Sequence, residues 1–366
     1  MDYRKLGDTG LEVSAIGMGC VQIASSRTEV ATAIVRRALD LGVTYFDVAR
    51  GYGDAEIKVG LGVASAPNVG RDDVVISTKT SARTREDAWR QINESLERLN
   101  TGYVDNLHLH ALRSTEDIDR RLGPDGALEA LIEARDQGMI HHIGCTSHRS
   151  EVLIEALRRF DFEVILVPMN LVEREPLDEL LPLCQGRGVG VTIMKPLATG
   201  LIPAPLALKW LLNQPIATAV PGITTLAELE EDVAVGRQPT ALTSEEQLAV
   251  QETRRRLEHV RCRICGACYP CPQGIPISMT LGTDVVFNHY RTMGAEAFRA
   301  FPWGPERIKH ELKRRPEIIA AIESCTRCGL CEERCPYGLR VMDMLAATLP
   351  AMRDMVRVFE DLAEAR

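Results

Sequence analysis

The stretch Tyr45-Phe46-Asp47-Val48-Ala49-Arg50-Gly51-Tyr52-Gly53 begins as a short apolar run and continues into a glycine-flanked turn. Similar runs recur over about 240 residues, separated by amphipathic segments with apolar residues at i, i+3 and i+4. Parallel strands need such crossovers, so the alternation predicts a closed α/β (β/α)8 TIM barrel. The expected strands are Ala15–Met18, Tyr45–Val48, Val74–Thr78, Asn106–His110, His142–Thr146, Val164–Val167, Gly190–Met194 and Thr218–Pro221.

The N-terminal segment has the pattern of a β-hairpin. Two short runs, Tyr3–Leu6 and Glu12–Ser14, flank the turn residues Asp8-Thr9-Gly10. We expect this hairpin to close the lower mouth of the barrel.

A second domain follows, so we expect a barrel over residues 1–240 and a mostly helical, ferredoxin-like iron–sulfur domain over residues 241–366. Thr243-Ser244-Glu245-Glu246 has the cap and early acidic residues of a helix start. Further helices are expected around Met279–Tyr290, Pro305–Arg314 and Val341–Arg366, with a turn at Phe301–Gly304.

Eight of the eleven cysteines lie in two short runs in this second domain. The first run is Cys262-x2-Cys265-x2-Cys268-x2-Cys271-Pro272, and the second is Cys325-x2-Cys328-x2-Cys331-x3-Cys335-Pro336. In two-cluster ferredoxins such runs hold iron–sulfur clusters, and the last cysteine of each run ligates the other cluster. The spacing predicts two [4Fe–4S] clusters, with one ligand set of Cys262, Cys265, Cys268 and Cys335 and another of Cys325, Cys328, Cys331 and Cys271.

Zinc and disulfides are the alternative interpretations of these cysteines. Zinc usually takes two separated Cys-x2-Cys pairs, which leaves the third cysteine of each run without its usual place. The first residues show no export signal, so we expect a cytoplasmic protein with reduced thiols. The first run closes with x2 where the ferredoxin pattern has x3, which makes Cys271 the ligand that departs from the pattern.

Composition limits the class of function. The chain has 366 residues, 45% of them hydrophobic and 26% charged, and a net charge of −8. An acidic chain without a basic stripe is not expected to bind nucleic acid, and no apolar stretch predicts a membrane span. A small-molecule substrate is the expected partner.

Asp47, Tyr52, Lys79 and His110 have the chemistry of a proton-transfer site. All four stand at or just beyond the C-terminal ends of predicted strands, where such barrels place their catalytic groups. An ammonium beside a tyrosine lowers the pKa of the phenol, and a carboxylate keeps that ammonium charged. A histidine can orient the substrate oxygen by hydrogen bonding. Together they would protonate a carbonyl oxygen while hydride arrives at carbon.

On these residues the chain resembles the aldo-keto reductases over roughly residues 1–240. The shared motifs are Phe46-Asp47-x4-Tyr52-Gly53 with Glu56 and Gly60, Ser77-Thr78-Lys79, Asp105-x4-His110, Gly126–Leu131, Gly138-Met139-Ile140 and Ile143–His148. The whole chain resembles the subgroup with a C-terminal ferredoxin-like extension that carries two tetranuclear clusters. The resemblance implies that Asp47, Tyr52, Lys79 and His110 form the family tetrad, and that NAD(P)H-linked carbonyl reduction uses Tyr52 as general acid.

The residues expected to hold the nicotinamide match the family pattern less closely than the tetrad residues do. Thr146 and Ser147 stand where Ser-Asn is usual, Leu166 replaces a glutamine although Asn170 is present, and Met194 replaces the aromatic that stacks on nicotinamide. Carboxylates near the eighth strand would repel the 2′-phosphate of NADP, so NADH is preferred to NADPH. The implied cofactor-binding residues are Thr146, Ser147, Asn170, Lys195, Leu197, Gly222, Thr224, Glu228 and Asp232.

Three functions remain open from the sequence. In the first, clusters relay single electrons from an external, ferredoxin-like electron-transfer protein to an aldo-keto reductase site. In the second, an ordinary NAD(P)H-dependent carbonyl reductase carries structural or redox-sensing clusters. In the third, the chain is an electron-transfer or scaffold subunit with an inactive barrel.

Overall fold

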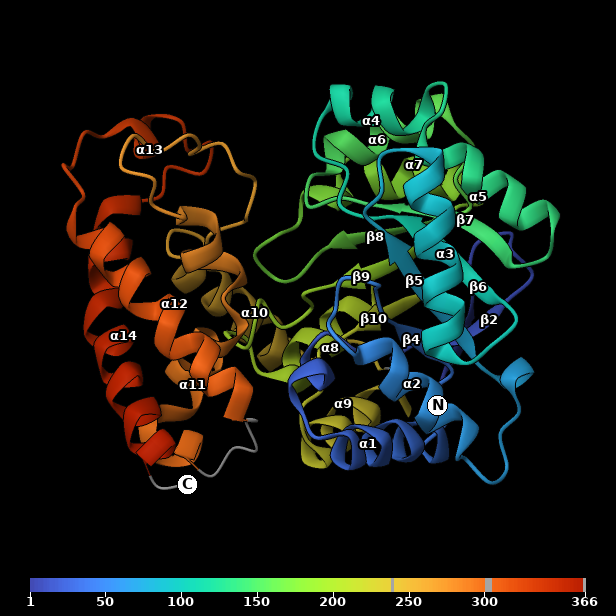
Figure 1. The fold of residues 1–366 in the computed structure, drawn as a ribbon, viewed down its shortest axis with the longest axis horizontal. Helices are drawn as coiled ribbons and strands as arrows, with labels where there is room; N and C mark the ends of the chain where they lie inside the picture. The colour runs from blue at the N-terminus through green and yellow to red at the C-terminus, as the bar shows by residue number, and fades with distance from the viewer. Residues whose placement is uncertain (238–239, 300–304, 365–366) are drawn as a thin grey trace. The chain divides into compact units, whose positions relative to one another are not determined.

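The computed structural model describes residues 1–237, 240–299 and 305–364. The chain divides into two compact units (Figure 1). The first comprises Met1–Leu197 and Ala204–Thr243, and the second comprises Ala198–Pro203 and Ser244–Arg366. The expected turn at Phe301–Gly304 and the last two residues of the expected terminal helix lie outside the described residues.

The first unit is the predicted (β/α)8 barrel. Its strands are β3 (Met18–Gly19), β4 (Tyr45–Asp47), β5 (Val75–Thr80), β6 (Val104–Leu109), β7 (Ile140–Thr146), β8 (Val164–Pro168), β9 (Gly190–Met194) and β10 (Thr218–Val220). Each strand pairs in parallel with the next along the chain. Parallel bridges from Ile16 to Ala219 and from Gly19 to Gly222 join the first strand to the last, which closes the barrel.

The first strand differs most from its expected bounds. We expected Ala15–Met18, but regular pairing covers only Met18–Gly19, while Ile16 makes an isolated bridge. Gly17 donates its N–H to the carbonyl of Ala219, and a Cβ at Gly17 would lie 3.0 Å from the Tyr45 carbonyl oxygen. The backbone therefore passes very close to its neighbours here, which favours glycine and interrupts a regular strand.

Helices alternate with the strands and cover the barrel (Figure 1). They are α1 (Thr28–Asp40), α2 (Ala55–Ala64), α3 (Arg85–Leu99), α4 (Thr115–Leu122), α5 (Ala127–Asp136), α6 (Ser150–Arg159), α7 (Leu180–Gly186), α8 (Ala204–Leu212) and α9 (Leu226–Arg237), with short 3-10 turns at Gln22–Ser25, Arg71–Asp73 and Glu175–Leu177. Asn100 ends α3 in the left-handed conformation, as its cap position predicts.

The predicted N-terminal hairpin closes one end of the barrel. Strands β1 (Tyr3–Lys5) and β2 (Glu12–Ser14) pair antiparallel. Leu6 and Val13 from the hairpin are fully buried in a cluster with Val75 and Val164, the first residues of β5 and β8. The hairpin therefore lies at the N-terminal ends of the strands and leaves the opposite end for chemistry.

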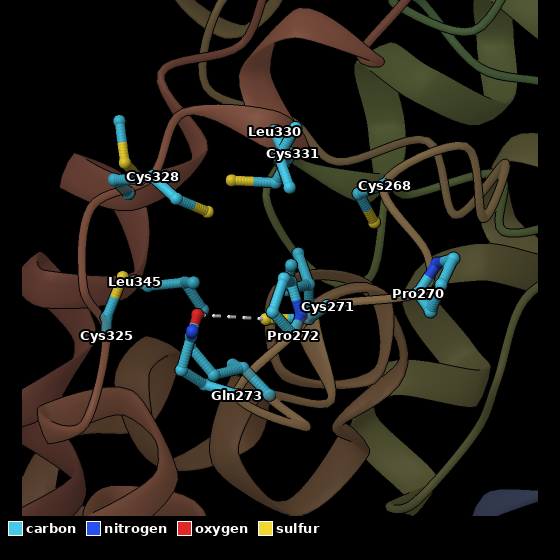
Figure 2. A pocket seen from close by; sticks show the side chains of 13 residues that line it. Cys268, Pro270, Cys271, Pro272, Gln273, Cys325, Cys328, Leu330, Cys331 and Leu345 are labelled. Carbon is cyan, nitrogen blue, oxygen red and sulfur yellow. Dashed lines mark hydrogen bonds between the residues drawn. The ribbon is translucent and has the colours of Figure 1, made fainter.

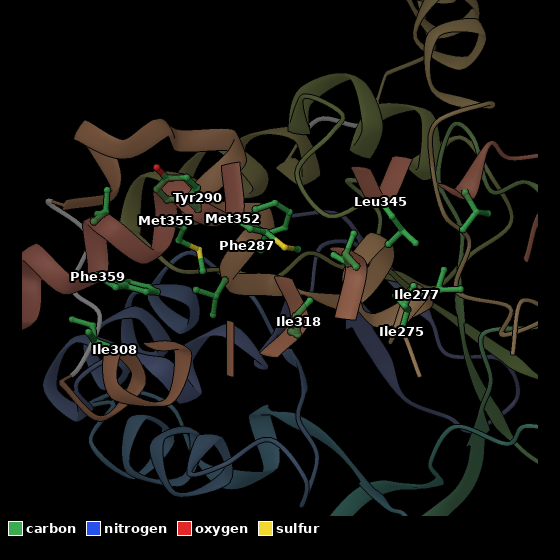
Figure 3. Packing of buried hydrophobic residues seen from close by; sticks show 14 of the residues in the cluster. Ile275, Ile277, Phe287, Tyr290, Ile308, Ile318, Leu345, Met352, Met355 and Phe359 are labelled. Atoms are coloured by element: carbon green, nitrogen blue, oxygen red, sulfur yellow. The ribbon is translucent and has the colours of Figure 1, made fainter. Parts of the chain in front are cut away.

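The second unit is helical, as predicted. Its helices are α10 (Ser244–Leu257), α11 (Val285–Arg299), α12 (Pro305–Glu323), α13 (Leu330–Glu333) and α14 (Val341–Glu364), with a π-helical turn at Met279–Thr283. Buried side chains from α11, α12 and α14, including Phe287, Ile318 and Met355, form its core (Figure 3). Six cysteines pack against this core: Cys262, Cys268, Cys271, Cys325, Cys331 and Cys335.

A buried ionic network supports the same helices. Arg315 is fully buried and contacts Asp284 at 2.5 and 3.0 Å and Glu311 at 2.6 Å. Two carboxylates on one guanidinium satisfy most of its hydrogen-bonding capacity, which a buried ion pair requires. In the described part of the chain, every helix is too short or too polar to cross a bilayer.

Candidate active site and cluster-binding pocket

The barrel brings the four tetrad residues together. Asp47 ends β4 and Lys79 lies near the end of β5, on the neighbouring parallel strand. His110 directly follows β6, and Tyr52 lies in the turn between β4 and α2. All four are therefore at or just beyond the C-terminal ends of adjacent strands, at the end opposite the hairpin.

Lys79 is the centre of this group. Its Nζ lies 2.8 Å from Asp47 Oδ1 and donates to the carbonyl of Val48 at 2.6 Å. The same ammonium lies 4.9 Å from the centroid of the Tyr52 ring. The rings of Tyr52 and His110 meet edge to face, with centroids 5.8 Å apart. The Tyr52 ring is thus close to both the cation and the imidazole.

Burial controls the protonation of these groups. Burial lowers the pKa of Lys79, but Asp47 and then Tyr52 raise it, and the net result is a raised pKa that holds the ammonium charged. Burial raises the pKa of Tyr52 above its ordinary value, and Lys79 opposes this shift without reversing it. The sequence predicted that Lys79 lowers the pKa of Tyr52. It did not predict that burial raises this pKa by a larger amount. The result suits an acid, because a raised pKa keeps the proton on the phenol.

His110 is held neutral. Burial and the cations Lys79, Arg121 and Arg113 lower its pKa to about 3. A neutral imidazole can donate one hydrogen bond to a substrate oxygen without competing for its proton. The other histidine of β6, His108, is fully buried and contacts Ser77 Oγ at 2.8 Å.

In the second unit the two cysteine runs come together around one pocket. The pocket is lined by Cys271 of the first run and by Cys325, Cys328 and Cys331 of the second (Figure 2). These four are the ligand set predicted for one cluster. Cys268 also borders the pocket, and its pKa is raised by burial and then by Cys262 and Cys265. Cys268 therefore lies within electrostatic range of the first two cysteines of its own run.

A second contact supports the exchange of the last cysteines. The guanidinium of Arg263, between Cys262 and Cys265, lies 4.1 Å from the ring centroid of Tyr337. Tyr337 follows Cys335 by two residues, and Arg334, which precedes Cys335, donates to the Pro270 carbonyl at 2.9 Å. The segment around Cys335 thus lies against the first run, as the crossed ligand set requires.

The backbone of the two runs is alike. Ile264 and Gly266 flank Cys265 with φ of 59° and 76°, and Arg327 and Gly329 flank Cys328 with φ of 53° and 82°. Left-handed residues in such loops turn successive N–H groups toward a common point, which favours a bound anion such as an iron–sulfur cluster. Ile264 and Arg327 carry side chains in this conformation, which costs free energy and is typical of functional loops.

The π-helical turn fits the first run. A Cβ on Gly282 would lie 2.3 Å from the Ile264 side chain, so only glycine allows the approach. Among the described residues no three His, Cys, Asp or Glu side chains are grouped closely enough for a single metal ion. A four-iron cluster does not need such a group, because its thiolates bind separate irons. The loops, the pocket and the thiol donors therefore fit two tetranuclear clusters.

Comparison with known proteins gives the family of each unit. Residues 15–204 match the aldo/keto reductase family. This chain belongs to the aldo/keto reductase family. Residues 258–339 match the 4Fe-4S dicluster domain. This aldo/keto reductase is therefore an oxidoreductase with an iron–sulfur domain.

Individual relatives agree with this assignment. The reductase is 31% identical over 312 residues to L-galactose dehydrogenase of Arabidopsis thaliana, across 71% of this chain and 94% of that protein. It is 29% identical to L-glyceraldehyde 3-phosphate reductase of Escherichia coli K12, across 55% of this chain and 63% of that protein. The solved holo form of aldo-keto reductase AKR11C1 from Bacillus halodurans matches with a TM-score of 0.60 and 26% identity, across 69% of this chain and 96% of that one.

The residues that the resemblance assigns to the nicotinamide are engaged within the barrel. Ser147 donates to the Leu112 carbonyl at 2.7 Å. Asn170 donates to Glu173 at 2.7 Å and to the Lys195 carbonyl at 3.2 Å. Thr146 accepts from the N–H of Ala111 at 2.7 Å and keeps its hydroxyl proton to donate. Ser147 and Asn170 therefore use their donors in these contacts, whereas the Thr146 hydroxyl only accepts in its contact with Ala111.

The loop residues assigned to the cofactor lie after β9 and β10. Lys195 Nζ lies 3.4 Å from the ring nitrogens of His148, and Leu197 is half-buried. A Cβ on Gly222 would lie 2.1 Å from the side chain of Gln22, so Gln22 crosses directly over this glycine. The Oε1 of Gln22 is buried, as is the Oγ1 of Thr224, and neither has a hydrogen-bond partner.

Carboxylates dominate the start of α9. Glu228 accepts the N–H groups of Thr224 at 2.7 Å and Thr225 at 2.9 Å, which places a negative charge at the helix N-terminus. Asp232 is 2% exposed, and burial with Glu228 and Glu231 raises its pKa to about 8. Asp232 is thus enclosed, whereas Glu228 is exposed and uses one oxygen, Oε2, for both N–H groups.

A buried network that the sequence did not reveal supports Tyr52. Glu56 of α2 is fully buried, accepts from Thr78 Oγ1 at 2.7 Å and pairs with Arg98 Nε at 3.0 Å. Arg98 also donates to the carbonyl of Gly53, the residue after Tyr52. The position of Glu56 in the Tyr52-Gly53 motif was a signal for this role, but nothing local to α3 pointed to Arg98.

Proposed function

We propose that this aldo/keto reductase reduces a carbonyl-like group of a small molecule, with Tyr52 as proton donor and with the clusters relaying electrons. The convergence of Asp47, Lys79, Tyr52 and His110 carries the proposal. The names of the curated relatives, a sugar dehydrogenase and an aldehyde phosphate reductase, favour a small carbonyl or hydroxyl compound as substrate.

The residues divide the proton chemistry between them. Tyr52 holds the proton that passes to the substrate oxygen, because burial keeps the phenol protonated. Lys79 lies beside the phenol and stabilises the negative charge that develops there as the proton leaves. Asp47 keeps Lys79 charged, and neutral His110 orients the substrate oxygen by donating a hydrogen bond.

The side chains on the cofactor side of the barrel favour the clusters over a nicotinamide as the electron source. Ser147 and Asn170 already donate to internal acceptors, and Leu166 and Met194 offer no polar group to a nicotinamide. When bound, the clusters supply electrons one at a time. Reducing a carbonyl to an alcohol consumes two electrons and two protons, so two one-electron deliveries serve each turnover. Tyr52 donates the proton that reaches oxygen, and water supplies the proton that reaches carbon. The partner is then an external, ferredoxin-like electron-transfer protein.

An ordinary NAD(P)H-dependent carbonyl reductase with structural or redox-sensing clusters is the second candidate, favoured by the family and by the free hydroxyl proton of Thr146. When bound, a reduced nicotinamide supplies hydride. Glu228 at the start of α9 would repel a 2′-phosphate, so this candidate uses NADH in preference to NADPH. A scaffold subunit with an inactive barrel is the third, and the intact tetrad argues against it.

One experiment separates the three. Anaerobically prepared, cluster-loaded protein is given a panel of small aldehydes and ketones with reduced methyl viologen, NADH or NADPH as donor. Turnover with the one-electron donor alone, lost in Tyr52→Phe, supports the proposal. Turnover with NADH that persists in a cluster-free Cys328→Ser and Cys265→Ser variant supports the second candidate. Turnover with none of the donors supports the third.

A further inference from the structure

We propose that the substrate carries an anionic group, a carboxylate or a phosphate, which binds to the guanidinium groups of Arg113 and Arg83 beside His110. The inference rests on the proposed function, because it names the class of small molecule that the tetrad reduces. It concerns two loops of the barrel, residues 81–84 after β5 and residues 111–114 after β6.

The two loops start side by side at the catalytic end of the barrel. β5 ends at Thr80, and the N–H of His110, directly after β6, donates to the Thr80 carbonyl at 2.9 Å. Arg83 follows Thr80 by three residues, and Arg113 follows His110 by three residues. Each loop therefore carries an arginine a short way along the chain from a strand end that holds a tetrad residue.

Asp117 of α4 joins these loops through one carboxylate. Its Oδ1 lies 3.2 Å from Arg121 Nε and 3.4 Å from Arg83 Nε, and its Oδ2 accepts the backbone N–H of Arg113 at 3.2 Å. Arg121 is 4% exposed and also donates to the His110 carbonyl at 2.9 Å. This network ties both loops and Arg121 to His110, the residue that orients the substrate oxygen.

Cations outnumber carboxylates in this network, because Asp117 is one carboxylate among three guanidinium groups. Burial lowers the pKa of Arg121, Asp117 opposes this shift, and Arg83 and Arg113 add to it. The three guanidinium groups are therefore close enough to repel one another. A bound anion would relieve that repulsion.

The surplus positive charge extends to the tetrad. Burial lowers the pKa of His110, and every charged group that adds to this shift is a cation, namely Lys79, Arg121 and Arg113. Lys79 is paired with Asp47, so the surplus at His110 comes from the arginines. A substrate whose carbonyl oxygen contacts His110 therefore lies in a field that favours a negative charge elsewhere on the molecule.

The guanidinium groups of Arg113 and Arg83 are accessible to a ligand. Arg113 is exposed, and within the described part of the chain its guanidinium pairs with no carboxylate. The neighbouring Glu116 has its pKa lowered by a hydrogen bond from Ser114 and not by a cation. The Arg83 side chain is 54% exposed and pairs only with Asp117 among the described residues. Arginine suits carboxylates and phosphates, because its planar group offers paired donors to two oxygens.

The test uses two pairs of aldehydes whose members differ by an anionic group. Succinic semialdehyde is compared with butanal, and glycolaldehyde phosphate is compared with glycolaldehyde, so the two pairs distinguish a carboxylate from a phosphate. Cluster-loaded protein is assayed without air, with the donor that supports turnover. We expect the anionic member of at least one pair to have the higher kcat/KM, by about 10- to 100-fold.

Three variants and a control assign that preference to the arginines. Arg113→Gln should remove most of the preference and Arg83→Gln part of it, whereas Arg113→Lys should retain part because it keeps the charge. Arg158→Gln removes an exposed arginine of α6 that pairs with Glu179, and it should keep the full preference.

Calorimetric binding of succinate and of inorganic phosphate to the same proteins needs no turnover. The parent should bind at least one of these anions, and Arg113→Gln should raise its Kd about tenfold or more. Binding of this kind without turnover of any aldehyde would overturn the proposed function alone. Binding of neither anion, binding that both glutamine variants leave unchanged, or equal or lower kcat/KM for the anionic member of both pairs would overturn the anionic substrate.

Discussion

Lys79 Nζ lies 2.8 Å from Asp47 Oδ1, and neither side chain is more than 7% exposed. A buried ion pair of this kind is weak support for stability, but removing one partner leaves an uncompensated buried charge. We therefore expect Asp47→Asn to lower the free energy of unfolding by about 3–5 kcal/mol and to reduce carbonyl turnover at least about a hundredfold. Denaturant unfolding and steady-state kinetics measure the two effects.

The double variant Asp47→Asn, Lys79→Met separates stability from catalysis. Because it removes both charges, it should recover much of the lost stability while remaining inactive. A double variant that regains activity together with stability would show that the pair only supports the fold.

Cys271 decides whether the first run lends a ligand to the cluster of Cys325, Cys328 and Cys331. Intact protein purified without air should contain about eight irons per chain, as two tetranuclear clusters require. Cys271→Ser should reduce iron to about four per chain, because its sulfur completes the ligand set in the pocket. Cys184→Ser, a buried barrel cysteine, is the matched control and should retain all its iron. Full iron in both variants would remove Cys271 from the ligand set.

Glu56→Gln tests the network that supports Tyr52. The change removes the negative charge that holds Arg98, and Arg98 in turn holds the Gly53 carbonyl beside Tyr52. A misplaced proton donor should lower kcat by about 10- to 100-fold with little change in KM. Glu133→Gln breaks a comparable but exposed pair with Arg85 and should leave kcat unchanged. Equal kinetics in the two variants would assign Glu56 a structural role only.

Much of the architecture was predictable, because the spacing of apolar residues marks each strand and helix locally and parallel strands need helices to connect them. The strand Gly190–Met194 has the predicted bounds, and seven others differ at one or both ends, most of all at Met18–Gly19, where close backbone approach replaces regular pairing. The cluster domain was predictable from thiol spacing alone. The hydrogen bond that Ser147 donates was not predictable, because its acceptor, the Leu112 carbonyl, lies 35 residues away in the chain.

The pKa of Tyr52 in the tetrad was likewise only partly predictable from the sequence. Sequence position predicted which four residues meet, and Lys79 does oppose the shift at Tyr52. The net direction depends on burial, which only the packed barrel determines. The pairing of Glu56 with Arg98 likewise joins two helices through a contact that no local pattern encodes.

The pKa shifts predict a flat pH profile for turnover. Tyr52 donates a proton only below its pKa, and burial raises that value above 10.0, so activity should persist into alkaline solution. The pKa of His110 is about 3, so the imidazole stays neutral throughout the measured range. We expect kcat/KM to vary little between about pH 5 and 9. An inflection near the ordinary histidine value that disappears in His110→Asn would contradict this assignment.

Asp232 gives a pH-dependent stability with a definite sign. Burial, Glu228 and Glu231 raise its pKa from 3.8 to about 8. Between those values the unfolded chain loses a proton that the folded chain keeps, so the free energy of unfolding falls as pH rises. Asp232→Asn cannot ionise and should remove this slope, which makes the variant more stable near pH 8 by about a few kcal/mol and equal to the parent near pH 4. Urea unfolding across that range measures the difference, with the exposed Asp161→Asn as control. Parallel stability curves for Asp232→Asn and the parent would mean that the carboxyl is already ionised in the folded barrel.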